Sequence, residues 1–168
     1  PMARGVYNSS SAMYRVRVLT NMPSKIADAS LMDLIACRIA RAKSLRDRLF
    51  LPSENTSAFR LVNSEGDGLS GLIADRIGNC IVVQSSALWT EKYRECIVAA
   101  FRAVCPDVPL VWEPQTARLA LDGYKLASII NTDCKEQIVK ENGVLYEARV
   151  ADGQKTGFYC DQRPQRQI

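Results

Sequence analysis

The chain contains no histidine, and this absence removes several kinds of chemistry at once. Ser-His-Asp triads, proton transfer by imidazole and metal sites with histidine ligands all require that side chain. The six cysteines also include no Cys-x-x-Cys pair, the spacing typical of structural zinc sites. Any catalytic or binding function must therefore rest on other side chains, and a zinc site is not expected.

The chain also lacks long hydrophobic runs. No run approaches the roughly 18 apolar residues that a transmembrane helix needs, and no hydrophobic segment typical of a signal peptide opens the sequence. The cysteines are scattered, and Cys37, Cys80 and Cys96 fall inside apolar helix or strand patterns. Such cysteines suit a reducing compartment better than a disulfide framework. We therefore expect a cytoplasmic or organellar protein that is neither secreted nor placed in a membrane.

What remains is an ordinary globular composition with a small excess of positive charge. Of the 168 residues, 47% are hydrophobic and 24% are charged, which is typical of a folded domain. The 22 Lys and Arg residues outnumber 18 Asp and Glu residues, giving a net charge of +4. An excess of this size permits contact with nucleic acid but does not require it.

Two elements with basic side chains are expected in the first third of the chain. Residues 14–19 alternate apolar and basic side chains, which predicts a strand with Arg15 and Arg17 on its solvent face. Residues 29–49 have the spacing of an amphipathic helix, with Asp28 as its N-cap. The apolar positions of this helix are Leu31, Leu34, Ile35, Ile39, Ala42, Leu45 and Leu49. Its opposite face carries the basic residues Arg38, Arg41, Lys43, Arg46 and Arg48.

The rest of the chain predicts an α+β fold with a small, mostly antiparallel sheet and packed helices. Strands are expected at 58–63, 72–77, 80–86 and 110–113. A helix capped by Thr90 should follow the third strand and bury Ile97 and Phe101. Because the strands are mainly joined by hairpins rather than by one helix each, a doubly wound parallel sheet is not expected.

Two turns and one irregular region complete the expected organisation. Gly78-Asn79 is a hairpin turn signal of moderate strength. Asn142-Gly143 is a stronger one, and it requires positive φ at both residues. Residues 115–135 show no clear periodicity, so loop and irregular structure are expected there.

A polar, glycine-rich strip lies near the end of the chain. Residues 153–163 read GQKTGFYCDQR. The beginning of this strip is like the tail of a phosphate-binding P-loop, but Gln154 separates Gly153 from Lys155, so the motif fails. From the residues alone, a plain turn is the first interpretation.

Three segments nevertheless resemble one family of enzymes. Residues 60–79, RLVNSEGDGLSGLIADRIGN, are similar to the RLV, DGLPGL and DR-G elements of that family, with Ser70 in place of the usual proline. Residues 153–163 are similar to its GQKTGFFLDQR segment, and residues 3–19 resemble the end of its N-terminal PUA domain, an RNA-binding module. The family is that of the S-adenosylmethionine-dependent large-subunit rRNA methyltransferases of the RlmI type, which form 5-methylcytosine.

The resemblance implies a piece of a three-part protein. Residues 1–22 would be a remnant of the PUA domain, 23–57 a linking helix, and 58–135 a central α+β domain. Residues 136–168 would form a hairpin and the truncated start of a Rossmann-like methyltransferase domain that is otherwise absent. The parent protein would use S-adenosylmethionine as cofactor and rRNA as partner, whereas this chain alone would bind the cofactor weakly or not at all.

The resemblance also implies site residues. The expected cofactor-binding residues are Lys155, Thr156, Phe158, Asp161, Gln162 and Arg163. The expected RNA-binding residues are Arg15, Arg17, Arg38, Arg41, Lys43 and Arg46. Cys160 lies inside the strip and is not expected to be the nucleophile. Pro164 and Gln165 depart from the family's continuation, and the family's glycine-rich cofactor loop and catalytic cysteine are not found in this sequence.

Two other interpretations stay open. The chain could be an RNA-binding accessory module without catalysis, or an inert product of truncation. From spacing alone, the basic side of the 29–49 helix is more often an ordinary solvated face than a surface that follows phosphates.

Overall fold

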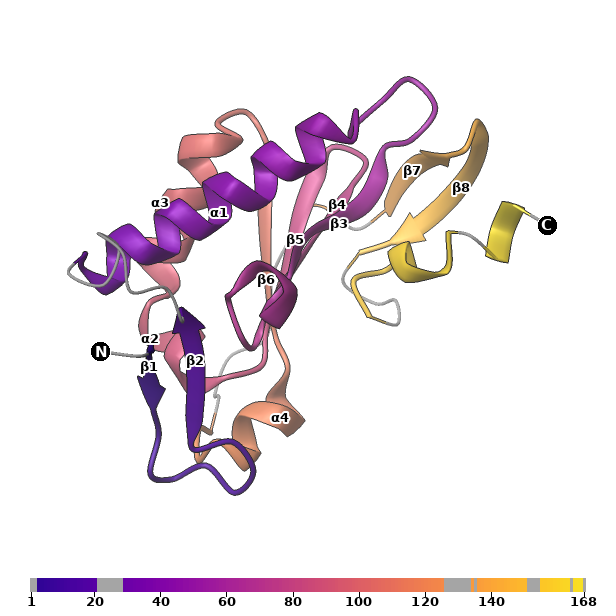
Figure 1. Ribbon diagram of the computed structural model, residues 1–168. Helices are drawn as coiled ribbons and strands as arrows, with labels where there is room; N and C mark the ends of the chain where they lie inside the picture. The colour runs from indigo at the N-terminus through magenta and orange to yellow at the C-terminus, as the bar shows by residue number, and fades with distance from the viewer. Residues whose placement is uncertain are drawn as a thin grey trace.

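The fold is built on a four-stranded sheet whose strands follow one another in chain order. A computed structural model describes residues 3–20, 29–125, 134, 136–150, 155–163 and 165–167. The strands of the sheet are β3 (Ala58–Asn63), β4 (Leu72–Ile77), β5 (Cys80–Ser85) and β6 (Leu110–Pro114). The first three are antiparallel neighbours, and β6 is parallel to β5 (Figure 1). The expected α+β fold with a mostly antiparallel sheet is therefore confirmed, with one parallel pair at its edge.

The first long helix, α1 (Leu31–Arg48), begins two residues later than expected. Its N-cap is Ser30, whose hydroxyl oxygen accepts a hydrogen bond from the backbone N–H of Asp33 at 3.1 Å. The Asp33 carboxylate in turn accepts one from the backbone N–H of Ser30 at 3.2 Å. This reciprocal capping box satisfies two N–H groups that the helix end would otherwise leave unpaired. The prediction of Asp28 as N-cap is wrong, and Asp28 itself lies outside the described residues.

Two helices, not one, connect β5 to β6. They are α2 (Leu88–Lys92) and α3 (Arg94–Val104). Thr90 is not a cap but lies fully buried inside α2. Its hydroxyl oxygen is 2.6 Å from both the Ala87 carbonyl oxygen and the Ser85 hydroxyl, so it closes the junction between β5 and the helix. The residue in the N-cap position is Ala87.

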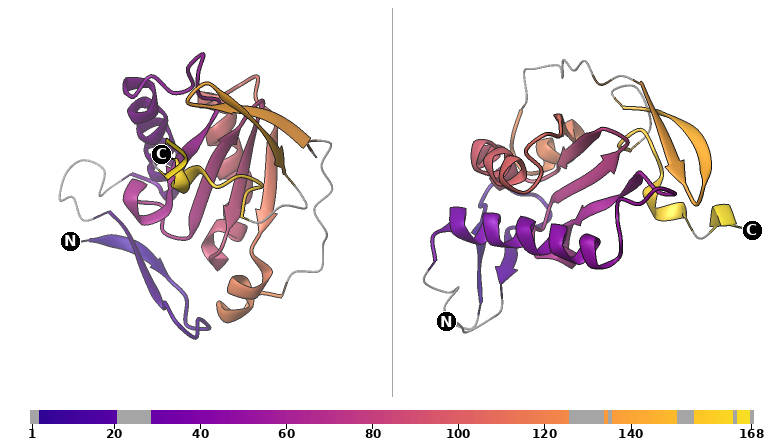
Figure 2. Two further views of the ribbon diagram at one scale, coloured as in Figure 1. Left: turned by 90° about the vertical axis from the view of Figure 1, so that its right-hand side faces the viewer. Right: turned by 90° about the horizontal axis from the view of Figure 1, so that it is seen from above.

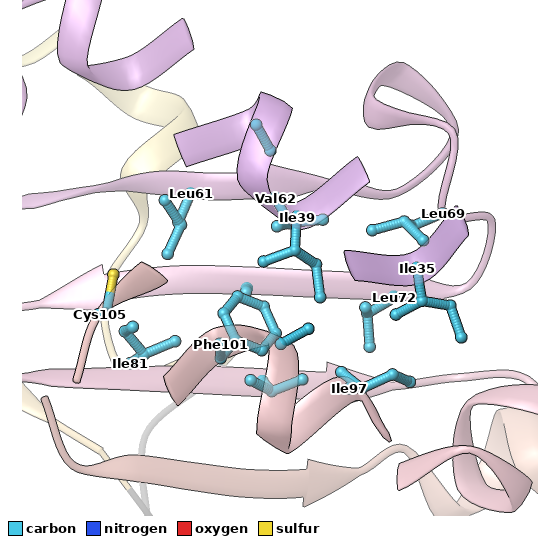
Figure 3. Packing of buried hydrophobic residues seen from close by; sticks show 14 of the residues in the cluster. Ile35, Ile39, Leu61, Val62, Leu69, Leu72, Ile81, Ile97, Phe101 and Cys105 are labelled. Carbon is cyan, nitrogen blue, oxygen red and sulfur yellow. The ribbon is translucent and has the colours of Figure 1, made fainter. Parts of the chain in front are cut away.

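One face of the sheet, together with α1 and α3, forms the larger hydrophobic core. Ile97 and Phe101, four residues apart on α3, are buried as expected, at 0% and 1% exposure. Figure 3 shows them in one cluster with Ile35 and Ile39 of α1 and with side chains of the sheet, among them Leu72 and Ile81. The apolar faces that the helical and strand periodicities predict therefore pack together in one core, as the apolar faces of amphipathic elements do.

A hairpin formed by β7 (Glu136–Glu141) and β8 (Val144–Arg149) covers the opposite face of the sheet (Figures 1 and 2). Its turn, Asn142-Gly143, has φ angles of 52° and 85°, so this prediction is confirmed. Backbone hydrogen bonds of 2.7 Å from Ser57 N–H to Lys140 and 3.0 Å from Gly143 N–H to Asn55 join the hairpin to the chain before β3. The buried residues of this second core are Ala58, Ile77, Cys80, Val82, Val111, Val139, Ala148, Val150 and Phe158.

Part of the region expected to be irregular is helical. Helix α4 (Thr116–Leu121) follows β6 and buries Leu119 completely, so the expectation of loop structure is wrong for this stretch. Six residues are too few for a clear amphipathic period, which is why the pattern does not predict the helix. The expectation for residues 126–133 and 135 lies outside the described residues.

The N-terminal hairpin, β1 (Arg4–Tyr7) and β2 (Val16–Thr20), departs in part from the expected alternation, because Arg15 before β2 is exposed as expected but Arg17 is not. Val16 and Val18 are 63% and 53% exposed, whereas the Arg17 side chain is only 13% exposed. Arg17 lies 3.6 Å from the buried Asp122 carboxylate and donates a 3.2 Å hydrogen bond to the Ser70 hydroxyl. Arg17 thus places its positive charge beside a buried carboxylate instead of in solvent, and a buried charge is costly when it is unpaired.

No helix in the described part of the chain is both long enough and apolar enough to cross a membrane.

Candidate functional site

The described part of the glycine-rich strip, residues 155–163, is attached to the sheet through Thr156. The Thr156 side chain is buried and its hydroxyl donates a 2.7 Å hydrogen bond to Asp75 of β4, a residue 81 positions earlier. The same carboxylate accepts both Nε–H and Nη2–H from Arg60 of β3, the latter at 3.3 Å. Asp75 is therefore the centre of a buried network that joins two strands of the sheet to the strip. Neither Asp75 nor Arg60 is among the site residues that the sequence predicts.

Burial dominates the electrostatics of this network. It raises the pKa of the Asp75 carboxyl, while Arg60 and Thr156 act in the opposite direction by favouring the charged form. Burial likewise raises the pKa of the Cys160 thiol well above its ordinary value. A thiol in that environment is a poor nucleophile, because the thiolate is the reactive form. Burial thus disfavours the thiolate form of Cys160.

The backbone of the strip lies directly against the end of β8. Gly157 has φ of 92°, and a Cβ atom at this position would lie 2.3 Å from the carbonyl oxygen of Arg149. Both the left-handed conformation and the close approach exclude a side chain here. Gly157 thus fixes how closely the strip follows the hairpin.

Aromatic and charged contacts fix the inner side of the strip. Phe158 is 8% exposed, and its ring centroid lies 5.6 Å from that of Tyr146 on β8. The Arg166 guanidinium lies 4.6 Å from the Phe158 ring and pairs with the buried Glu141 at 2.5 and 2.8 Å. The strip therefore has packing partners within this chain. Glu141 and Arg166 were not predicted as a pair.

The outer side of the strip carries the remaining polar groups. Lys155 and Asp161 form an ion pair of 2.7 Å, and the hydrogen bond from Lys155 lowers the pKa of the Asp161 carboxyl. Gln162 is exposed, and Arg163 is half-buried with contacts of 3.3 Å to Thr56 and 3.5 Å to Asn142. Of the six residues expected to bind the cofactor, Thr156 and Phe158 therefore face the protein. The other four lie on the accessible side.

The basic face of α1 is divided into three environments. Arg38, Arg41 and Arg48 line one cavity of about 250 Å³ beside the short turn η1 (Ser64–Asp67). Lys43 pairs with Asp47 at 2.6 Å elsewhere on the helix. Arg46 does not share the exposed face that the sequence predicted. It is 8% exposed and makes two 2.9 Å hydrogen bonds to the Asp67 carboxylate.

The six residues expected to contact RNA are thus not one surface. Arg38 and Arg41 lie together, whereas Arg46 and Arg17 are turned inward to Asp67 and Asp122 respectively. Arg15 is exposed on the N-terminal hairpin. Arg48, which was part of the basic helix face but not of the expected RNA-binding set, joins the cavity.

Curated proteins match the chain over almost its whole length. "Ribosomal RNA large subunit methyltransferase I" of Alteromonas mediterranea is 35% identical over 167 residues, covering 98% of this chain and 41% of the relative. The protein of the same name from Pseudoalteromonas atlantica is 32% identical over 169 residues, covering 99% of this chain and 42% of the relative. The chain therefore spans about two fifths of the length of these relatives. No protein-family model matches it.

Solved structures share the fold. One, assigned as a methyltransferase and crystallised in complex with SAH, superposes with a TM-score of 0.73 at 22% identity, covering 98% of this chain and 40% of the other. Another, assigned as a SAM-dependent methyltransferase from Streptococcus mutans, gives a TM-score of 0.72 at 21% identity and covers 41% of that chain.

Proposed function

Because the chain is homologous along nearly all of its length to part of the ribosomal RNA large subunit methyltransferase I proteins, we propose that it is a segment of an enzyme that methylates large-subunit rRNA. The methyl donor in this proposal is S-adenosylmethionine. The homology at 98% coverage is the observation that carries the proposal. The SAH in one structural relative supports the choice of donor, because SAH is what S-adenosylmethionine becomes after losing its methyl group.

We propose further that the methylated atom is C5 of a cytosine, as the resemblance of residues 60–79 and 153–163 implies. That reaction requires a cysteine thiolate that adds to C6 of the base and so activates C5. Burial raises the pKa of the thiols of Cys80, Cys105 and Cys160, which makes all three unsuited to this step. Since the catalytic cysteine of the family that the chain resembles is not matched in this sequence, the proposal assigns no catalytic residue to the described part of the chain.

The strip is proposed to form one wall of the cofactor site. Its inner residues Thr156 and Phe158 hold it against the sheet, so their role is to position the backbone. On its outer side, Lys155, Asp161 and Gln162 present a cation, a carboxylate and an amide to the solvent. These groups are able to form hydrogen bonds with the amino, carboxylate and hydroxyl groups of S-adenosylmethionine.

A chimaera provides a direct test of the enzyme proposal. The 167 matching residues of the Alteromonas relative would be replaced by this chain, and transfer of a radioactive methyl group to 23S-type large-subunit rRNA would be measured. Nuclease digestion and mass spectrometry would identify the methylated base. We expect methyl transfer, with 5-methylcytosine as product. A folded chimaera that binds rRNA but transfers no methyl group would contradict the proposal, and a different methylated base would contradict only the assignment to cytosine.

The isolated 168-residue chain is expected to bind S-adenosylmethionine with a dissociation constant weaker than about 10 μM. Lys155 and Asp161 already pair with each other, so the strip has few unengaged donors and acceptors. Each hydrogen bond contributes about 0.5–1.5 kcal/mol net, whereas micromolar binding needs about 8 kcal/mol in addition to the cost of ordering the ligand. Isothermal titration calorimetry measures this directly. Binding at or below about 10 μM would show that the strip is a complete site.

A further inference from the structure

We propose that the cavity between α1 and η1, referred to here as the arginine cavity, binds a phosphate group of the RNA backbone. The cavity is lined by Arg38, Arg41, Ala42, Leu45, Arg48, Gly66 and Asp67. This inference rests on the proposed RNA substrate, and it specifies where one part of that RNA is held. Its basis is the spacing, the free donors and the unbalanced charge of the cavity.

Three arginines reach the cavity because of their spacing on α1. Positions 38, 41, 45 and 48 recur at intervals of three or four residues, so they form one stripe along the helix. Leu45 lies between the arginines on this stripe and is 45% exposed. The stripe therefore faces η1 and solvent, while Ile35, Ile39 and Ala42 face the core.

The donors of these arginines are largely unused. Arg41 and Arg48 form no hydrogen bond or ion pair with the described residues, and both are exposed. Arg38 donates one 3.2 Å hydrogen bond to the carbonyl oxygen of Leu19, and its Nε–H is buried without a partner. A guanidinium offers five N–H donors in a planar fork that matches phosphate oxygens. The cavity thus holds three cations whose donors have few acceptors within the protein.

The one carboxylate in the lining does not neutralise them. Both oxygens of Asp67 accept hydrogen bonds from the buried Arg46, each at 2.9 Å. One of these oxygens also accepts the backbone N–H of Asn63 at 2.6 Å. Because Asp67 is fully engaged by Arg46, the charges of Arg38, Arg41 and Arg48 remain unbalanced. An anion is therefore the ligand that the electrostatics favour.

Two glycines lie at or beside the cavity, and one of them makes room for the side chain of Arg38. Gly66 is part of the lining and places no side chain in it. Gly68 has φ of 71°, and a Cβ atom there would come within 3.0 Å of Arg38 Nε. The cavity volume of about 250 Å³ lies below the roughly 300 Å³ of the smallest drug-sized pockets. A phosphate group fits a site of this size better than a base and its sugar together.

The test compares a double neutralisation with a matched control. Arg41→Gln with Arg48→Gln removes two cations from the arginine cavity, and Arg102→Gln with Arg94→Gln removes two cations from α3, outside the cavity lining. The probe is a fluorescently labelled single-stranded RNA of twelve nucleotides with mixed sequence, and its affinity for the 168-residue chain is measured at several NaCl concentrations. Unfolding midpoints in urea verify that each variant is folded.

The double cavity variant should lose about 0.7 from the slope of log K against log[NaCl], since one neutralised phosphate contributes about 0.7 for single strands. At 0.1 M NaCl this corresponds to an affinity loss of about fivefold. The α3 control should change the slope and the affinity much less. A second variant, Gly66→Asp, places a carboxylate at the cavity wall without removing an arginine, and it should also weaken RNA binding.

Several outcomes would overturn the proposal. Equal effects of the cavity and α3 variants would show that RNA responds only to net charge. An unchanged affinity in both the double variant and Gly66→Asp would show that the cavity does not hold RNA. In a separate arm, inorganic phosphate is titrated by calorimetry, and binding of phosphate that depends on Arg41 and Arg48, with RNA binding unaffected, would make this a site for free phosphate instead.

The result is separable from that of the chimaera. RNA binding that depends on the arginine cavity, together with no methyl transfer by a folded chimaera, would reject the enzyme proposal and leave the inference standing for an RNA-binding module. Methyl transfer without any effect of the cavity variants would reject the inference alone.

Discussion

Replacing Asp75 with alanine is expected to lower the free energy of unfolding by about 3–5 kcal/mol, which is the range for removing one partner of a buried ion pair. Asp75 is 0% exposed and binds both Arg60 and Thr156. Without the carboxylate, the Arg60 charge loses its partner within a largely buried environment, and the Thr156 hydroxyl loses its best acceptor. Urea unfolding followed by circular dichroism measures the change.

The Asp75 prediction has two controls. Glu147→Ala removes a carboxylate from an exposed pair with Arg149, in which both side chains are more than half exposed, and should cost less than about 1 kcal/mol. The double replacement Arg60→Met with Asp75→Leu removes both charges together, and most of the stability should return because apolar residues replace buried pairs at little cost. A double variant as unstable as Asp75→Ala would show that the lost charge balance is not the cause.

Because the pKa of Asp75 is raised, the contribution of the Arg60–Asp75 pair to stability is expected to depend on pH. Burial raises this pKa above its usual value of 3.8, so the folded state binds the proton more tightly than the unfolded state does. The contribution of Asp75 to stability therefore falls as pH rises from about 3.8 through the raised pKa. The double variant Arg60→Met with Asp75→Leu should lack this component of the pH dependence.

Replacing Phe101 with alanine is expected to cost about 3–5 kcal/mol of unfolding free energy, because the buried ring leaves a cavity that its neighbours fill only partly. Phe101 is 1% exposed in the core between α1, α3 and the sheet (Figure 3). The neighbouring Arg102 is exposed on the same helix, and Arg102→Ala should change stability by less than about 0.5 kcal/mol. Urea unfolding of both variants gives the comparison. Equal costs for the two would mean that the ring is not part of a rigid core.

The elements of this fold could be predicted where the pattern is local. The Asn142-Gly143 turn follows from the two residues that tolerate positive φ. The burial of Ile97 and Phe101 follows from a helical period. The second face of the sheet could not be predicted in the same way, because nothing local indicates that β7 and β8 pack against Ala58 and Val82 rather than forming a separate unit.

Charged residues in inward positions were the main source of error. The core stripe of α1 runs through Ile35, Ile39 and Ala42, and the next position at the same spacing is Arg46. Spacing alone places a basic residue on the solvent side, because burying an unpaired charge is costly. Arg46 can occupy the core side because Asp67 lies opposite, and that position depends on the path of η1.

The candidate site was predicted by resemblance and not by physical reasoning. The glycine-rich strip alone reads as a turn, and its partners Asp75 and Arg60 lie in another segment that shares no local pattern with it. One signal in the sequence was usable. Asp75 interrupts a row of apolar residues on one face of β4, where the strand pattern predicts an apolar side chain. The division of the six strip residues into inner and outer groups required the three-dimensional structure.

The second core also imposes an order of events during synthesis. Its sheet side is complete once Val111 has been made, but the hairpin that covers it begins to contribute only with Val139, 28 positions later. At ordinary rates of translation the interval is about 1.5–6 s. During that time an apolar face of the sheet has no cover from its own chain, and early strands with exposed apolar surface are prone to association. Once β7 and β8 have been made, they cover this apolar face in the nascent chain. In the folded protein the same hairpin also shapes the candidate site.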